Sequence, residues 1–494
     1  MYKRFTRREF VKVTAGLGTI TTFLPTTLLF ARSKTPKAEA VRMLGRTNWQ
    51  ATTLGLGGQA SLQWTKEGID PVRLILKAID SGINYIDTSN VYGPSQLNIG
   101  KAFKKLNLIP GQPNYNEKLR KSLFIASKTH MRYANHEGRD SGLNSNSDGS
   151  WVKNALDDVK RSLSQIFGDG NGNYPKGTYL DSVQIHNIQT FKHVDAIYMG
   201  LDNPDPKAGP IGALAGLLDL RDGTNKTGLN PKNEKLIKHI GITGHWSSPA
   251  HMYAIQRDTG NIIDTLLVAI NANDRLYLNH QYNVIPVAKA KRMGIVGMKI
   301  FADGLFYGKS PKFSRTPQDV ILSVGSKEMP SDFLIQYSLS IPGVNTLIIG
   351  IGNERQLTAN LQAAQLQEPL SETERRKIEQ RAGKILGGKT NYFQMPPIDL
   401  TPPRNVNVEV EPSYSPDIKV IRISWHTAYA GNEPIVGYEV LKDGKAFKWF
   451  DFIPQTTLDP YIAIDKMTDK EKHRYEVRVK DRSGNEKISS AVLV

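Results

Sequence analysis

The sequence contains no cysteine. Disulfides, thiol nucleophiles, thiolate metal sites and lipid attachment through a cysteine are therefore excluded. Lysine and arginine form no dense block interleaved with aromatic residues, so the net charge of +17 gives little reason to expect nucleic acid binding. No repeat or low-complexity tract is present. A metal-dependent hydrolase would have poor ligand spacing, because no HxH pair follows the first predicted strand among His130, His186, His193, His245 and His251.

The N-terminus has the features of an export signal. Arg7 and Arg8 form an arginine pair, a mildly apolar stretch follows, and residues 38–40 form a small-x-small site. The pattern resembles a twin-arginine signal peptide over residues 1–40 and implies the twin-arginine export machinery as a partner. An ordinary signal peptide or a single membrane anchor is the alternative. We therefore expect a periplasmic or extracellular protein, membrane-anchored if the signal stays uncleaved.

Between residues 41 and 395, short apolar strands alternate with amphipathic helices. Eight strands are predicted, at Leu54–Gly57, Asn84–Asp87, Leu123–Ser127, Asp181–His186, Lys238–Gly241, Leu266–Ile270, Gly294–Met298 and Thr346–Ile349. Apolar spacings of three and four predict helices such as Asp70–Ser81, Trp151–Phe167, Ser248–Asp258, Ile285–Met293 and Ser331–Leu339. Eight strand–helix units indicate an α/β fold, the (β/α)8 TIM barrel. A doubly wound open sheet is the competitor, but the LGLGGQ run lacks GxGxxG spacing.

The composition changes again near the C-terminus. Residues 396–404 form a Pro-rich linker, and residues 405–494 switch to period-two runs separated by turn signals, which predicts a small all-β domain. Trp425 and the GYEV and RYEV runs make this domain resemble an immunoglobulin-like sandwich of the fibronectin type III kind. We expect its aromatic residues to fill the core. A carbohydrate-binding face, with an envelope polymer as partner, is the alternative.

Four side chains that can transfer a proton to a carbonyl oxygen lie at or near predicted strand ends. Asp87 and His186 close their strands, Lys128 directly follows one, and Tyr92 lies in the loop after Asp87. In a barrel such positions meet at one face. A phenol titrates near a pKa of about 10, and the Lys128 ammonium is expected to lower the pKa of Tyr92. Asp87 would keep Lys128 charged and His186 would orient the carbonyl. A helix cap or a satisfied buried polar group is the alternative for each residue singly.

Residues 41–395 resemble the aldo-keto reductase family. The RMLGRTNWQATTLGLGG run is similar to the family's opening hairpin and first strand, DTSNVYG to its Asp-and-Tyr motif, IASK to its lysine motif and VQIHN to its histidine motif. The resemblance implies a catalytic tetrad of Asp87, Tyr92, Lys128 and His186. Tyr92 would be the general acid in carbonyl reduction and the general base in reverse. The implied reaction is hydride transfer between a nicotinamide cofactor and a carbonyl or alcohol carbon.

The IIGIGNERQLTANL run resembles the loop and helix with which the family holds the adenosine phosphate end of the cofactor. Backbone N–H groups of Gly350, Gly352 and Asn353 lie near a helix start, which suits a phosphate. Gln356 and Asn360 lie four residues apart on one helix face and are expected to reach the adenine side. A plain amphipathic helix is the alternative.

Several family positions carry other residues. Thr243-Gly244 stands where the family has Ser-Asn after the fifth strand, Leu267 replaces a glutamine, and Met298 replaces the aromatic residue that stacks on the nicotinamide. In this altered region of the site, we expect Thr243 and Lys299 to bind the cofactor, Lys299 through the pyrophosphate. A solvated surface lysine is the alternative for Lys299.

The 2′-phosphate site of the family is also altered. Gly350, Ile351 and Gln356 replace its basic and hydroxyl residues, and only Arg355 offers charge nearby. NADP and NAD therefore both stay open as the cofactor.

The leading prediction is an exported aldo-keto reductase acting on a sugar or small carbonyl compound. Because nicotinamide cofactors are not known to be recycled outside the cytoplasm, we expect the cofactor to be loaded before export and held tightly. The alternative is a catalytically weak barrel that acts, with the fibronectin-like module, as an envelope binding protein.

Overall fold

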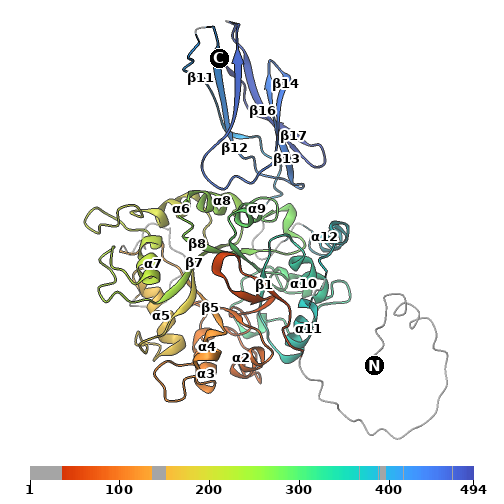
Figure 1. Cartoon of the computed structure of the whole chain (residues 1–494). Helices are drawn as coiled ribbons and strands as arrows, with labels where there is room; N and C mark the ends of the chain where they lie inside the picture. The colour runs from red at the N-terminus through yellow and green to blue at the C-terminus, as the bar shows by residue number, and fades with distance from the viewer. Residues whose placement is uncertain are drawn as a thin grey trace, which may run out of the picture. The chain divides into compact units, whose positions relative to one another are not determined.

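The computed structural model of the chain describes residues 36–135, 152–365, 368–387, 389, 396–415, 417–469 and 471–494 (Figure 1). The paired arginines and most of the predicted signal peptide lie outside these residues, so export stays a prediction. Within the described part of the chain, no helix combines the length and the apolar character needed to cross a membrane.

Eight parallel strands close into a barrel. They are β3 (Leu54–Gly57), β4 (Tyr85–Asp87), β5 (Phe124–Thr129), β6 (Leu180–Ile185), β7 (Ile237–Gly244), β8 (Ile263–Ala269), β9 (Gly294–Met298) and β10 (Thr346–Ile349). Each strand pairs with the next along the chain, and β10 returns to pair with β3. The predicted (β/α)8 barrel is confirmed, and β3, β9 and β10 have the predicted bounds.

Helices surround the barrel (Figure 1). They are α2 (Pro71–Asp80), α3 (Ser95–Lys105), α4 (Glu117–Lys121), α5 (Ala155–Phe167), α6 (Phe191–Tyr198), α7 (Ala213–Asp222), α8 (Ser248–Arg257), α9 (Val284–Ala290), α10 (Ser331–Leu339), α11 (Glu354–Ala364) and α12 (Glu372–Leu386). Short 3-10 turns lie at Gly45–Thr47, Asp274–Leu276, Ala302–Tyr307 and Pro317–Asp319. The predicted helix 151–167 begins later, at Ala155, because the side chain of Asn154 accepts two backbone N–H groups of the first turn.

A hairpin closes the amino-terminal end of the barrel. Strands β1 (Val41–Met43) and β2 (Gln50–Thr52) pair antiparallel. Leu44, between them, packs with Tyr85 and Phe124 from the first positions of β4 and β5. Gly45 has a φ of +51°, and a Cβ there would overlap the backbone of Gly294, so this close approach requires glycine. With that end filled, the carboxyl ends of the strands are where a site can open.

The C-terminal region consists of two antiparallel sheets. One sheet has the order β11 (Arg404–Glu411), β12 (Lys419–His426), β15 (Tyr461–Met467). The other has β14 (Lys445–Asp451), β13 (Ile435–Lys442), β16 (Arg474–Asp481) and β17 (Glu486–Ile488), with β18 (Val492–Leu493) beside β16. Trp425, Tyr438 and Tyr475 are fully buried in one core cluster, as expected for an aromatic core. The fibronectin type III assignment, the domain boundaries and polymer binding stay predictions.

Candidate active site

The carboxyl-terminal end of the barrel brings three of the predicted catalytic residues together around a buried lysine. Lys128, on β5, donates to Asp87 Oδ1 at 2.5 Å and to the carbonyl of Thr88 at 2.9 Å. Its Nζ lies 5.0 Å from the ring centre of Tyr92. Asp87 ends β4, which pairs with β5, so strand pairing places its carboxylate beside the lysine. Both charged side chains are 2% exposed and form an ion pair shielded from water.

The fourth predicted residue, His186, directly follows β6, the strand that pairs with β5. Its ring centre lies 4.3 Å from that of His130 and 6.1 Å from that of His245. Burial, followed by His130, holds the pKa of His186 well below its ordinary value. The imidazole is therefore neutral at neutral pH and can donate a hydrogen bond from one ring nitrogen.

Burial dominates the electrostatics of the other three residues. It lowers the pKa of Lys128 and raises the pKa of Asp87, while each charge opposes the shift of the other. Burial, followed by the charge of Asp87, raises the pKa of Tyr92 well above its ordinary value. The expected net lowering of the Tyr92 pKa is therefore wrong for the structure, because desolvation of the phenolate is the largest cause of its shift. Tyr92 keeps its proton at neutral pH.

A buried carboxylate on α5 holds the loop after β4 against the end of β5. Asp158 accepts from Asn90 Nδ2 at 2.6 Å, from Thr129 Oγ1 at 2.9 Å and from the backbone N–H of His130 at 2.7 Å. His130 Nε2 in turn shares a hydrogen bond with the hydroxyl of Ser89 at 2.8 Å. Burial raises the pKa of Asp158 to about 6. Sequence reasoning missed this network, although an acid on the buried face of a predicted helix was a usable signal.

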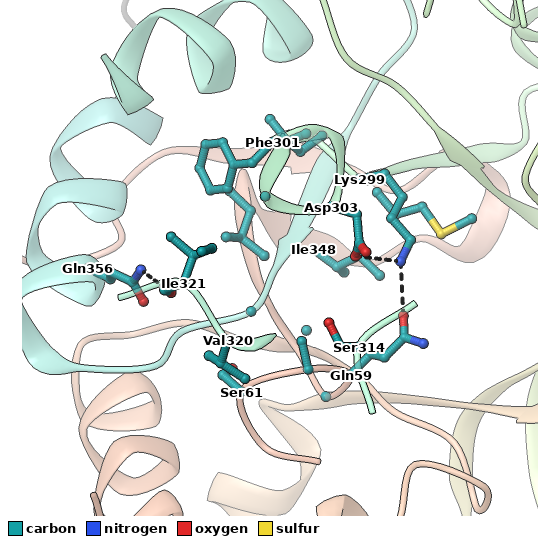
Figure 2. Close-up of a pocket in the computed structure, with 18 of the residues that line it drawn as sticks. Gln59, Ser61, Lys299, Phe301, Asp303, Ser314, Val320, Ile321, Ile348 and Gln356 are labelled. Atoms are coloured by element: carbon teal, nitrogen blue, oxygen red, sulfur yellow. Dashed lines mark hydrogen bonds and ion pairs between the residues drawn. The ribbon is translucent and has the colours of Figure 1, made fainter. Parts of the chain in front are cut away.

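One cavity is lined by Asp87, Tyr92 and Lys128 at one end and by Gln356 and Asn360 of α11 at the other. Its empty space of about 1080 Å³ includes open solvent. Figure 2 shows side chains from the loops after β3 and β9, from β10 and from α11 that line it.

Lys299, which directly follows β9, lines this cavity, and its amine points toward Gln59 and Asp303 (Figure 2). Its Nζ lies 3.2 Å from Gln59 Oε1 and 3.2 Å from Asp303 Oδ1. The side chain is only 9% exposed, so the alternative of a solvated surface lysine is wrong. Lys309 also binds Asp303, at 2.5 Å, so two cations share this carboxylate.

The beginning of α11 is held by hydrogen bonds within the chain. The side chain of Asn353 caps the helix by accepting the N–H of Gln356 at 2.8 Å. Gln356 Oε1 accepts the N–H of Gly352 at 2.8 Å, and its Nε2 donates to the carbonyls of Ile321 at 3.0 Å and Ser323 at 2.9 Å. Of the five predicted residues here, Gly350, Gln356 and Asn360 line the cavity, whereas Gly352 and Asn353 do not.

The cavity lining carries two apolar side chains where the family resemblance implies a glutamine and an aromatic residue. These are Leu267 and Met298. Thr243 pairs with Leu267 in the barrel, does not line the cavity, and its buried Oγ1 has no hydrogen-bond partner among the described residues. A Cβ at Gly244 would overlap the imidazole of His251, so no larger side chain fits at that position.

The residues of this cavity suit a nicotinamide dinucleotide. Lys299 offers a cation for a pyrophosphate, Asn360 offers an amide, and Leu267 and Met298 offer an apolar surface. Within the described ranges, no group of three or more histidine, aspartate or glutamate side chains could hold a metal ion.

Comparison with known proteins places the chain in a family. The model of the aldo/keto reductase family matches residues 53–382. No curated protein matches. Among solved structures, a protein from Pseudomonas aeruginosa assigned to the aldo-keto reductases is 21% identical, with 67% of this chain and 96% of that chain covered and a TM-score of 0.42. The aldo-keto reductase AKR11C1 from Bacillus halodurans is 19% identical, with 69% of this chain and 95% of that chain covered and a TM-score of 0.42. Because the family model matches more than half of this chain, the chain belongs to the aldo/keto reductase family, whose members are NAD(P)-dependent oxidoreductases.

Proposed function

We propose that this protein is an exported oxidoreductase that transfers hydride between NAD(P)(H) and a carbonyl or alcohol carbon of a sugar or small carbonyl compound. One observation carries the proposal. The buried Lys128 contacts Asp87 and faces the ring of Tyr92 at the same cavity that Lys299, Gln356 and Asn360 line. A proton donor and a cavity with a cation and amide side chains in its lining thus meet at one end of the barrel.

The chain supplies the proton and the geometry, whereas a bound nicotinamide supplies or accepts the hydride. In reduction, Tyr92 donates its proton to the carbonyl oxygen, and in oxidation its phenolate takes a proton from the alcohol. The Lys128 charge, 5.0 Å from the ring centre, favours the phenolate that the reduction leaves. The neutral imidazole of His186 is suited to donate a hydrogen bond to the carbonyl and orient it. General acid catalysis of this kind contributes roughly 10²–10⁴-fold.

Cofactor titration combined with two substitutions tests the catalytic assignment. Binding of NADH and NADPH is followed by quenching of tryptophan fluorescence, and turnover is measured on a panel of sugars and small aldehydes. Tyr92→Phe and Lys128→Met should still bind cofactor but lose turnover, by about 10²–10⁴-fold for Tyr92→Phe. Tyr115→Phe, outside the cavity lining, is the matched control and should keep turnover. Full activity of Tyr92→Phe would refute its role. Failure of the native protein to bind either cofactor at micromolar concentration would favour the catalytically weak scaffold instead.

The export part of the proposal rests on the twin-arginine pattern in residues 1–40. Since nicotinamide cofactors are not known to be recycled outside the cytoplasm, the cofactor would be loaded before export and stay bound. Mass spectrometry of protein purified from the envelope should then detect NAD(H) or NADP(H). The double variant Arg7→Lys/Arg8→Lys tests the route. If this variant is recovered only from the cytoplasm, the twin-arginine route is supported. Unchanged export of that double variant would contradict it.

A further inference from the structure

The end of the cavity at α11 carries no cation of its own. Among the described residues that line the cavity, the lysines are Lys128 and Lys299, and none is an arginine. Lys128 is paired with Asp87 near Tyr92, and Lys299 is held by Asp303 and Gln59. Both cations therefore serve other parts of the cavity.

The α11 end is instead lined by neutral side chains and one acid. Val320, Ile321, Ser323 and Gln356 lie there, and Gln356 is hydrogen-bonded to the backbone of Ile321 (Figure 2). Asp319 also lines the cavity. Hydrogen bonds from the backbone N–H of Arg315, followed by the ammonium of Lys312, hold the pKa of Asp319 below its ordinary value, so it is ionised at neutral pH.

Several of the donors at this helix start already bind the chain itself. The N–H of Gly352 donates to Gln356 Oε1, and the N–H of Gln356 donates to Asn353. Both hydrogens of the Gln356 amide are used for the carbonyls of Ile321 and Ser323. A phosphate that used any of these donors would have to break a hydrogen bond within the chain.

The cations near α11 are directed elsewhere. Arg355 is exposed and does not line the cavity. Arg73 binds Glu354 Oε1 at 2.6 Å, and Lys77 binds the other oxygen of the same carboxylate. Lys312 binds Asp319 Oδ1 at 2.9 Å. A second phosphate on the adenosine ribose, close to a dianion, would thus meet no unpaired arginine or lysine among the described residues that line the cavity, and would face the carboxylate of Asp319.

From this arrangement we infer that the site selects an adenosine ribose without a 2′-phosphate, and so binds NAD(H) in preference to NADP(H). The inference rests on the proposed function, because it concerns the same cofactor cavity. A ribose hydroxyl needs only a neutral or acidic partner, which this end of the cavity offers, whereas a 2′-phosphate is ordinarily recognised by an arginine. A missing charge-assisted contact implies that NADH binds about 10- to 100-fold more tightly than NADPH.

Direct binding measurements test the preference without requiring a substrate. The full-length protein, stripped of nucleotide, is titrated with NADH and NADPH by fluorescence quenching and by calorimetry at two salt concentrations. The preference should be reversed, or reduced by about tenfold, in Ser323→Arg, which adds a cation at an exposed residue lining this end of the cavity. Because that variant keeps every hydrogen bond of Gln356, its NADH affinity should be nearly unchanged. Gln356→Arg is the second variant with the same expected direction.

Arg355→Gln is the matched control, because it removes the neighbouring cation one position away on the same helix. It should leave both affinities unchanged. A native protein that binds NADPH as tightly as NADH, or an NADPH affinity that falls in Arg355→Gln, would overturn the inference while leaving the oxidoreductase assignment intact. Binding of neither nucleotide would instead refute the proposed function, and the inference with it.

Discussion

Replacing Lys128 tests whether the buried ion pair organises the site. In Lys128→Met the Asp87 carboxylate, 2% exposed in the native protein, loses its counter-charge and its 2.5 Å hydrogen bond. Breaking a buried pair by removing one partner costs about 3–5 kcal/mol of unfolding free energy. The apolar double variant Asp87→Leu/Lys128→Met removes both charges, so it should recover most of that loss.

The stability loss caused by Lys128→Met should depend on pH, and the direction of that dependence is a second test of the buried ion pair. Burial raises the pKa of Asp87 in the native protein, and Lys128 opposes this shift, so removing Lys128 raises the pKa further. A carboxyl whose pKa is higher in the folded than in the unfolded state stabilises the fold below its unfolded value of about 4, and that contribution is lost as pH rises. The penalty of Lys128→Met should therefore be smaller at pH 5 than at pH 8.

Urea unfolding of the native protein, both single variants and the double variant gives the coupling energy at each pH. The barrel transition must be separated from that of the C-terminal sheets, because a multi-domain chain need not unfold in one step. A double variant whose loss equals the sum of the single losses, or a penalty that is the same at pH 5 and pH 8, would refute the buried ion pair.

Three further predictions follow from the site. Asp158→Asn should lower turnover more than cofactor affinity, because Asp158 holds the loop after β4 against β5. Since burial raises the pKa of Asp158 to about 6, the contribution of this carboxyl to native stability should be lost as the pH rises from about 4 to 6. Unfolding of the native protein and of the variant as a function of pH would reveal this loss. Gly244→Ala should destabilise the barrel by about 1–3 kcal/mol through overlap with His251, and His251→Ala should relieve much of that cost; thermal unfolding that shows no rescue would contradict the overlap. Because burial holds the pKa of His186 well below its ordinary value, turnover should show no acidic limb near pH 6.5 from this residue, and a His186→Gln variant that abolishes such a limb would disprove the assignment.

The sequence predicted that Asp87 and Lys128 lie together, because strand ends in a parallel barrel must meet. Asp87, Lys128 and His186 are each tied to a short apolar run, and strand pairing then brings them together. The pKa direction of Tyr92 was wrong, because the depth of burial depends on packing from many segments at once. Asp158 was missed for a related reason: its partners Asn90 and His130 lie 68 and 28 residues away in sequence.

The departures from the family pattern are accommodated by packing rather than left as gaps. The imidazole of His251 occupies the space beside Gly244 where a larger side chain would project. Gln356, in place of a basic residue, ties α11 to the segment that carries Ile321 and Ser323. At one end Leu267 stands in the lining where the family resemblance implies a glutamine; at the other, Gln356 occupies the N–H of Gly352. Both changes shift the recognition of a dinucleotide away from its charged and amide groups, so shape and burial along the cavity must supply more of the affinity than in a site built around a 2′-phosphate.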